Sequence, residues 1–153
     1  TTIKKQYRLR WYGTHGVQHW MRVRANGILL AERTGVDPRM VVLFALLHDS
    51  RRMNESADRE HGKRAAEYLA TLEPVIRLMP AKELELLKYA CEFHTSGLTQ
   101  ADPPVQVCWE SCPFRSLRAH FRERGISIAE VGSSDDLTYP NRRTYYCVKM
   151  AAR

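Results

Sequence analysis

The chain has 153 residues, of which 44% are hydrophobic and 27% charged. These values are typical of a globular domain and exclude a fibrous or disordered chain, so we expect a single domain over residues 1–153. The longest apolar run, Met40 to Leu47, is too short to span a bilayer, and the first residues contain no apolar stretch of signal-peptide length. We therefore expect neither export nor a membrane partner.

The cysteines form neither a CxxC pair nor a dense framework. In a chain with no expected export signal, this pattern predicts reduced thiols and a cytoplasmic protein. The four residues are Cys91, Cys108, Cys112 and Cys147.

The formal net charge is +7, and six basic residues precede the first acidic one, Glu32. Such a surface attracts anions, which could be nucleic acid or a phosphorylated substrate. The alternative is a solvated basic surface, which we favour over dedicated nucleic-acid binding because no recognised nucleic-acid motif accompanies the charge.

The predicted elements are helices. Residues 16–34 lack proline, have apolar positions at helical spacing and end before Gly35. Asp37-Pro38 supplies an N-cap and a first helical position for a second, mostly buried helix that reaches His48.

Three further helices follow. Asp58 can cap a third helix whose apolar positions continue to Ile76, Pro80 opens a fourth that Ser96-Gly97 ends, and a fifth begins near Pro103-Pro104. A small β hairpin is predicted over residues 138–150. The fold class is therefore all-α, a compact bundle of about five helices.

One polar stripe runs along the first helix. His15, His19, Arg22 and Asn26 fall within about 60° of one another, since each residue advances about 100°. A polar stripe ordinarily faces solvent, but the apolar residues of this helix leave no clean opposite side. An inward-facing polar site is therefore credible.

His48 and Asp49 close the apolar second helix. A lone histidine in that place is more often a hydrogen-bonded core residue than a ligand. The adjacent carboxylate changes this balance, because a carboxylate at the end of an apolar run is costly unless a cation or hydrogen bonds compensate it. His61 and His94 also lie at the ends of apolar stripes, and the combined set is of the kind that binds a divalent metal.

These residues occur in recognisable motifs: HGVQHW at 15–20, LLHD at 46–49, HG at 61–62 and FHTSG at 93–97. Over about residues 12–110 the chain resembles the HD-domain superfamily of metal-dependent phosphohydrolases. The resemblance implies a helical domain in which His19, His48 and Asp49 bind a first divalent ion, whether Mn, Zn, Mg, Co, Ni or Fe.

The resemblance also implies further roles. His61 and His94 look like the histidines that hold a second ion or the substrate phosphate in dinuclear members, and His15 and Asn26 lie on the same substrate-binding side. Arg51 and Arg52 could clamp phosphate oxygens, with Arg22 on the His19 face, while Glu55 or Asp58 could handle protons. The alternative for the loop is an ordinary charged segment in which Asp58 serves only as a helix cap.

The chain departs from the family at the last metal-binding aspartate. The segment reads CWESC, with Cys112 in the expected place and Glu110 two residues earlier. A shift of two residues on a helix turns a side chain by about 200°, so Glu110 should point away. Cysteine ligates zinc but is a poor ligand for Mg or Mn, so we expect weakened metal binding and low phosphatase activity. Residues 111–153 form a divergent segment.

Three functions follow from this pattern. The first is hydrolysis of a nucleotide or other small phosphoester, in which a metal ion lowers the pKa of water and polarises a phosphoryl oxygen, with Asp49 as the bridging carboxylate. The second is a catalytically inactive ligand-binding or regulatory protein with the same fold. The third is an oxygenase with a dinuclear iron site, because some members of the superfamily carry out oxidation.

Overall fold

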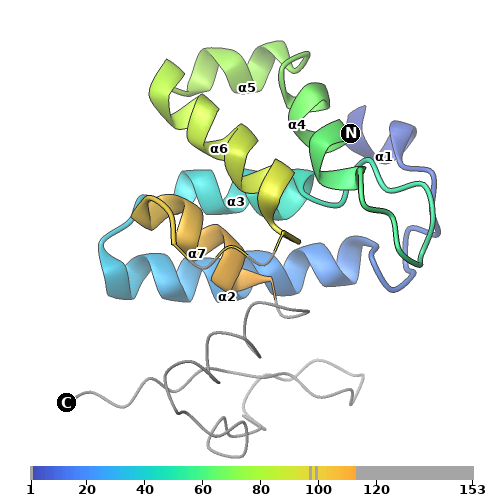
Figure 1. Ribbon diagram of the computed structural model, residues 1–153, viewed down its shortest axis with the longest axis horizontal. Helices are drawn as coiled ribbons and strands as arrows, with labels where there is room; N and C mark the ends of the chain where they lie inside the picture. The colour runs from blue at the N-terminus through green and yellow to red at the C-terminus, as the bar shows by residue number, and fades with distance from the viewer. Residues whose placement is uncertain (1, 97, 99, 113–153) are drawn as a thin grey trace, which may run out of the picture.

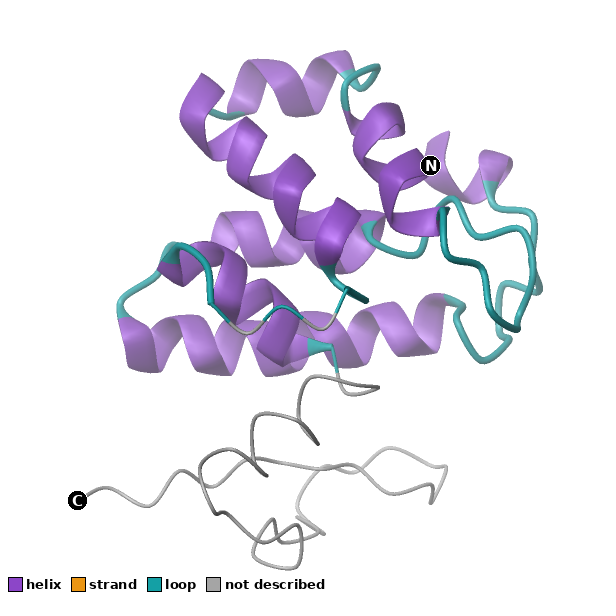
Figure 2. Cartoon of the chain, in the orientation of Figure 1, coloured by secondary structure: helices purple, strands orange, loops and turns teal. Residues whose placement is uncertain are grey.

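All regular elements are helices in the computed structural model, which describes residues 2–96, 98 and 100–112 (Figures 1 and 2). The all-α prediction is confirmed, and the described part has two short helices beyond the five predicted. No described helix is both long and apolar enough to cross a membrane. The predicted hairpin over 138–150 lies outside the described residues. The helices are α1 (Thr2–Gln6), α2 (Val17–Thr34), α3 (Pro38–Leu47), α4 (His61–Leu69), α5 (Glu73–Leu78), α6 (Ala81–Phe93) and α7 (Pro103–Ser111).

The boundary between α2 and α3 follows local signals in the sequence. Gly35 ends α2 with a φ of 72°, a left-handed conformation that glycine adopts without a Cβ penalty. The Asp37 side chain then accepts a hydrogen bond from the Arg39 backbone N–H at 2.8 Å, and Pro38 begins α3. These signals set the start of the helix that leads to His48.

The predicted third helix is wrong in its extent, because the chain forms two helices, α4 and α5. The backbone N–H and the hydroxyl of Thr71 both donate to the Tyr68 carbonyl, which closes the last turn of α4. Pro74, which lacks an N–H group, then stands in the first turn of α5. A helix continuing through residue 74 would lose a backbone hydrogen bond at that proline.

Helix α3 lies at the centre of the fold. It packs against α2, α6 and α7, while α4 packs along α6 (Figure 1). The core between these helices is apolar and closely packed, and burial of such side chains is the main force that stabilises the domain. Its largest fully buried members include Phe44, Leu47, Leu69, Leu87 and Val105.

A glycine allows α4 to approach α6 closely. A Cβ atom on Gly62 would lie 2.5 Å from the Cys91 carbonyl oxygen and 2.7 Å from that of Glu92. Both distances are shorter than a non-bonded contact allows, so a side chain at this position would push the helices apart. The contact places His61, the first residue of α4, beside His94 at the end of α6.

Candidate metal centre

The carboxylate of Asp49 lies among four imidazoles. Its Oδ2 atom is 3.5 Å from His19 Nε2 and 3.6 Å from His48 Nε2. Its Oδ1 atom is 3.2 Å from His61 Nε2 and 3.7 Å from His94 Nε2. The five side chains are nearly inaccessible to solvent, at 0–3% exposure.

The centre has two halves, one on each carboxylate oxygen. In the Oδ2 half, His19 Nε2 and His48 Nε2 are 3.1 Å apart, and Cys112 Sγ is 3.9 Å from His19 Nε2. The Oδ1 half contains His61 and His94, whose Nε2 atoms are 2.9 Å apart. Two groups of donors in this cluster are close enough to hold a metal ion: His19, His48 and Cys112, and His48, Asp49 and His94.

Helix ends bring these side chains together although they are far apart in the sequence. His48, His94 and Cys112 are the C-terminal cap residues of α3, α6 and α7. His61 is the first residue of α4, and His19 lies in the first turn of α2. The centre therefore depends on the packing of five helices and cannot form from any one of them.

Backbone carbonyls orient three of the imidazoles. The Nδ1 atom of His48 faces the Phe44 oxygen at 3.1 Å, and that of His94 faces the Cys91 oxygen at 2.7 Å. The Nδ1 atom of His61 pairs with the backbone carbonyl of Asp58, three residues earlier in the chain. A carbonyl oxygen only accepts, so each Nδ1 carries the proton, and in a neutral ring Nε2 then presents a lone pair to the centre.

Burial keeps the imidazoles of the Oδ2 half neutral. It lowers the pKa of His19 from 6.5 to about 4 and that of His48 to about 3, although the Asp49 carboxylate opposes both shifts. Burial tends to raise the pKa of Asp49, but its polar neighbours, His48 foremost, hold it well below the usual range. At neutral pH an ionised carboxylate thus faces neutral imidazoles.

The donor set fits a divalent cation. Imidazole lone pairs and carboxylate oxygens at 3.1–3.6 Å repel one another unless a proton or a cation lies between them. The lowered histidine pKa values mean that protons are bound weakly there at neutral pH. Imidazole and carboxylate are ligands of Zn, Mn, Fe, Co and Ni, so this buried cluster could hold such an ion.

Arg52 enters the Oδ1 half from the loop after α3. Its Nη1 atom lies 3.4 Å from Asp49 Oδ1 and 3.2 Å from His61 Nε2, and the residue is 7% exposed. Its Nη2 atom donates to the Ser56 carbonyl at 2.7 Å, which fixes the loop around the guanidinium. Of the two arginines predicted as phosphate clamps, this one reaches the centre.

Two other predicted catalytic residues have partners outside the centre. Arg51 donates to Gln6 Oε1 at 2.9 Å and stacks over the Tyr68 ring at 4.8 Å. The Asp58 carboxylate accepts hydrogen bonds from Arg64 at 2.6 Å and from the Met53 backbone N–H at 2.8 Å. The side chain of Asp58 does not cap α4, because the N-cap is Glu60.

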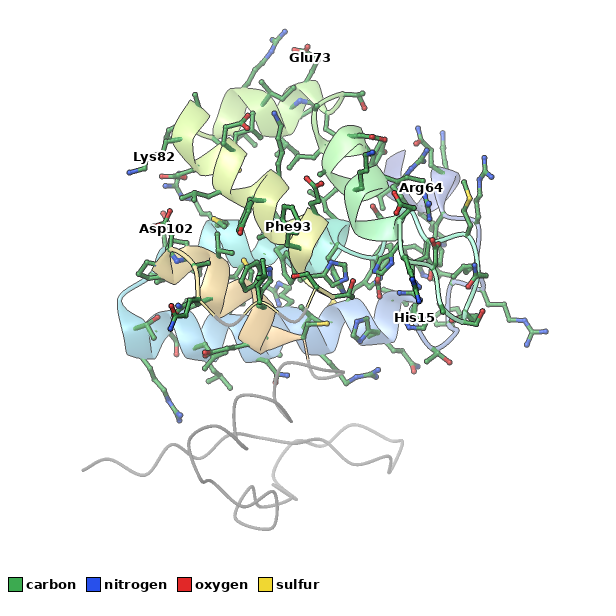
Figure 3. The ribbon with its side chains drawn as sticks, in the orientation of Figure 1. His15, Arg64, Glu73, Lys82, Phe93 and Asp102 are labelled. Atoms are coloured by element: carbon green, nitrogen blue, oxygen red, sulfur yellow. The ribbon has the colours of Figure 1, made fainter. Side chains whose placement is uncertain are left out.

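Two members of the predicted polar stripe, His15 and Asn26, lie outside the carboxylate–imidazole cluster. One is at its edge and the other at a contact between helices. The His15 ring is 6.1 Å from that of His19, and its Nδ1 atom is 2.6 Å from Glu55 Oε2. Figure 3 shows His15 at the end of the molecule where Arg64 also lies. Asn26 donates to the Ser111 carbonyl at 3.4 Å and so holds the end of α7 against α2.

The charge of Arg22 contributes to the lowered pKa of His19, so this arginine lies near the Oδ2 half. Glu110 belongs to neither group of metal donors, whereas Cys112 belongs to one. Cys112 follows the last residue of α7 with an extended backbone, and the predicted direction of Glu110 stays a prediction.

Several groups that shape the centre were not among the predicted site residues, because they belong to none of the histidine motifs. The Phe44 ring stacks on the His48 ring with centroids 4.9 Å apart, and its carbonyl holds the same imidazole. Asp49 also contributes to the raised pKa of Tyr7, after burial and Glu55, which places this tyrosine near the centre. Spacing alone could have suggested Phe44, which lies one helical turn before His48.

Comparison with known protein families, with curated proteins and with solved structures found no match for this chain.

Proposed function

We propose that the chain is a metal-dependent phosphohydrolase of the HD type that acts on a nucleotide or another small phosphoester. The observation that supports it is the arrangement around Asp49, whose two carboxylate oxygens each face two imidazole Nε2 atoms. A carboxylate shared in this way suits one or two divalent ions, with His19, His48 and Asp49 holding the first.

A bound divalent cation would supply a Lewis acid that activates water and polarises a phosphoryl oxygen. The residues of the chain would prepare the site for it. Carbonyl contacts at Nδ1 of His48, His61 and His94 hold each Nε2 toward the centre, which lowers the cost of ordering ligands when the ion binds.

Arg52 is the residue best placed to bind the substrate phosphate. Its guanidinium is a planar donor that matches phosphate oxygens, and it already lies at Asp49 Oδ1. His15 is the candidate for proton transfer at the rim, because Glu55 holds its ring at 2.6 Å beside His19. Arg51 and Asp58 would have supporting roles, since their side chains bind Gln6 of α1 and Arg64 of α4.

The experiment loads the full chain in turn with Zn, Co, Mn, Mg and Fe(II), measures bound metal, and screens nucleotides and nitrophenyl phosphoesters. We expect bound metal and released phosphate or alcohol, both lost in Asp49→Asn. A chain that binds metal but cleaves no phosphoester would contradict the hydrolase, and consumption of dioxygen by an iron-loaded pair would favour the oxygenase. Absence of any bound metal would favour the inactive ligand-binding protein.

A further inference from the structure

Cys112 completes the Oδ2 half from the end of α7. Its Sγ atom is 3.9 Å from His19 Nε2, and the donors of His19, His48 and Cys112 all lie within 4.8 Å of one another. Cys112 is half-buried, and α7 is held against α2 by the hydrogen bond from Asn26 to Ser111. The packing of α7 on α2 therefore holds the thiol in a cluster with two buried imidazoles.

We propose that His19, His48 and the Cys112 thiolate make the Oδ2 half a zinc-selective site, with Asp49 Oδ2 beside them. This proposal rests on the proposed function, because it assigns the identity of the cation at the same centre. It also changes the expectation from sequence: the cysteine redirects metal preference instead of merely weakening the site.

The spacing of the donors suits zinc. Ligand atoms about 2.0–2.3 Å from one tetrahedral zinc ion lie roughly 3.3–3.8 Å from one another. The separations in the structure are 3.1 Å between His19 and His48, 3.5 and 3.6 Å from these to Asp49 Oδ2, and 3.9 Å from His19 to Cys112. Small shifts of the side chains bring all of these into the required range.

The chemistry of the donors also discriminates between metals. Thiolate is a soft ligand that binds zinc and cobalt well, whereas Mg and Mn prefer carboxylate, carbonyl and water oxygens. The Oδ1 half offers His61, His94 and a carboxylate oxygen, and the group of metal donors that contains His94 includes no cysteine. The two halves should therefore differ in the metals that they prefer.

The test uses Co(II) as a spectroscopic probe in the full chain, after treatment with a chelator and under reducing conditions. Thiolate bound to Co(II) gives a charge-transfer band in the near ultraviolet, which imidazole and carboxylate do not give. We expect this band to saturate at one cobalt per chain and to disappear when zinc is added. It should be absent in Cys112→Ser.

Two control variants keep the band if the assignment is right. Cys108 lies four residues earlier on α7, is fully buried and belongs to neither group of metal donors, so Cys108→Ala removes a thiol that is not a ligand. His61→Gln alters the Oδ1 half at an imidazole that belongs to neither group of metal donors containing His48. In a competition titration, Cys112→Ser should lower zinc affinity at least about 100-fold, more than the loss of an outer-shell partner costs, with less than about tenfold change for Mn(II).

Cys112→Asp provides a second variant that keeps a ligand at the position. It should lose the near-ultraviolet band, and its preference for zinc over Mn(II) should fall at least about tenfold because oxygen replaces sulfur. Cobalt bound without the band, or a band that persists in Cys112→Ser, would overturn the zinc–thiolate site and leave the metal-dependent hydrolase standing. Failure of the unmodified chain to bind cobalt or zinc would overturn the zinc–thiolate site alone if Mn, Mg or Fe(II) still binds, and failure to bind any of these ions would overturn both proposals.

Discussion

The two halves of the centre share Asp49 but are completed by opposite kinds of side chain. The Oδ2 half is completed by the thiol of Cys112, which becomes an anionic ligand when it binds a metal. The Oδ1 half is completed by the guanidinium of Arg52, which is always cationic. The donors of the Oδ2 half should therefore attract a cation from solution. The Oδ1 half already has a positive charge, which lies 3.4 Å from its carboxylate oxygen.

This difference predicts an order of filling. A divalent ion entering the Oδ2 half meets neutral imidazoles and a carboxylate oxygen, with a thiol that can lose its proton to the solvent. An ion entering the Oδ1 half must displace or tolerate Arg52. Two unit charges of the same sign repel by about 4 kcal/mol at 4 Å near a protein surface, and the double charge of the ion doubles this repulsion. We expect the Oδ2 half to bind first and more tightly.

The largest effect is expected from Asp49→Asn, which alters both halves at once. The amide has nearly the shape of the carboxylate but lacks its charge, so metal affinity should fall at least about 100-fold and hydrolysis should fall to background. Metal analysis and phosphoester assays measure this, and circular dichroism checks that the variant is folded. A variant that keeps tight metal binding would show that the shared carboxylate is not the link between the halves.

The position of Asp49 at the end of an apolar helix could be predicted from the sequence. A carboxylate after an apolar run is unusual enough to be identified without a structure, and the Gly35 and Asp37-Pro38 signals set the helix that carries it. The direction of Arg52 could not be read in the same way, because two arginines follow each other in a turn and only the fold decides which one points inward.

The remaining errors have similar causes. The break between α4 and α5 was missed because the apolar spacing continues across it, although Pro74 was a usable signal. The carbonyls of Phe44 and Cys91 that orient the imidazoles have no side-chain identity to recognise. Local chemistry was therefore visible in the sequence, while orientation came from packing.

The next largest effect is loss of stability in acid for the metal-free chain. The pKa values of His19 and His48 are lowered from 6.5 to about 4 and about 3, so the unfolded chain binds their protons first as the pH falls. Their contribution is complete above pH 6.5 and is lost as the pH falls toward 4. Each histidine contributes a slope of about 1.4 kcal/mol per pH unit within this window.

Urea unfolding of chelator-treated protein at pH 7, 6 and 5 measures that slope. The double variant His19→Gln, His48→Gln serves as the control and should have a flatter profile. A free energy of unfolding that stays constant from pH 7 to pH 5 in the unmodified chain would contradict the buried, neutral histidines of the Oδ2 half.

Two glycines allow each half to be disturbed separately, with an expected cost of about 1–3 kcal/mol each. A Cβ on Gly62 would lie 2.5 Å from a backbone oxygen of α6 and should displace the Oδ1 half. A Cβ on Gly27 would lie 1.9 Å from Val41 Cγ1 and 3.2 Å from Ser111 Cβ, so it should displace α2 from α3 and α7 and disturb the Oδ2 half.

Thermal unfolding should show a fall of about 2–4 °C for each kcal/mol lost in a chain of this size. The cobalt–thiolate band should survive Gly62→Ala and weaken in Gly27→Ala. Gly35→Ala is the control, because its φ of 72° is strained for alanine while nothing lies within 4 Å of the new Cβ. Equal loss of the band in Gly27→Ala and Gly62→Ala would mean that the halves do not respond separately.

The smallest effect concerns the charge in the Oδ1 half. Arg52→Met removes the guanidinium that contacts Asp49 Oδ1 and His61, so affinity for a second ion should rise about tenfold, equivalent to about 1.4 kcal/mol and well below the full repulsion because the arginine can move aside. Arg51→Met makes the same change one residue earlier, but Arg51 contacts Gln6 and Tyr68, so second-ion affinity should stay the same. Calorimetric titration with Mn(II) after the first site is filled with zinc measures both affinities.

Arg52→Lys separates the effect of charge from that of loop structure, because it keeps the charge but loses the planar contacts to the Ser56 and Asn54 carbonyls. An equal gain in second-ion affinity in Arg52→Lys would show that the structure of the loop, and not the charge of Arg52, keeps this affinity low. An equal gain in Arg51→Met would show that the general positive charge of the loop, and not the contact with Asp49, is responsible.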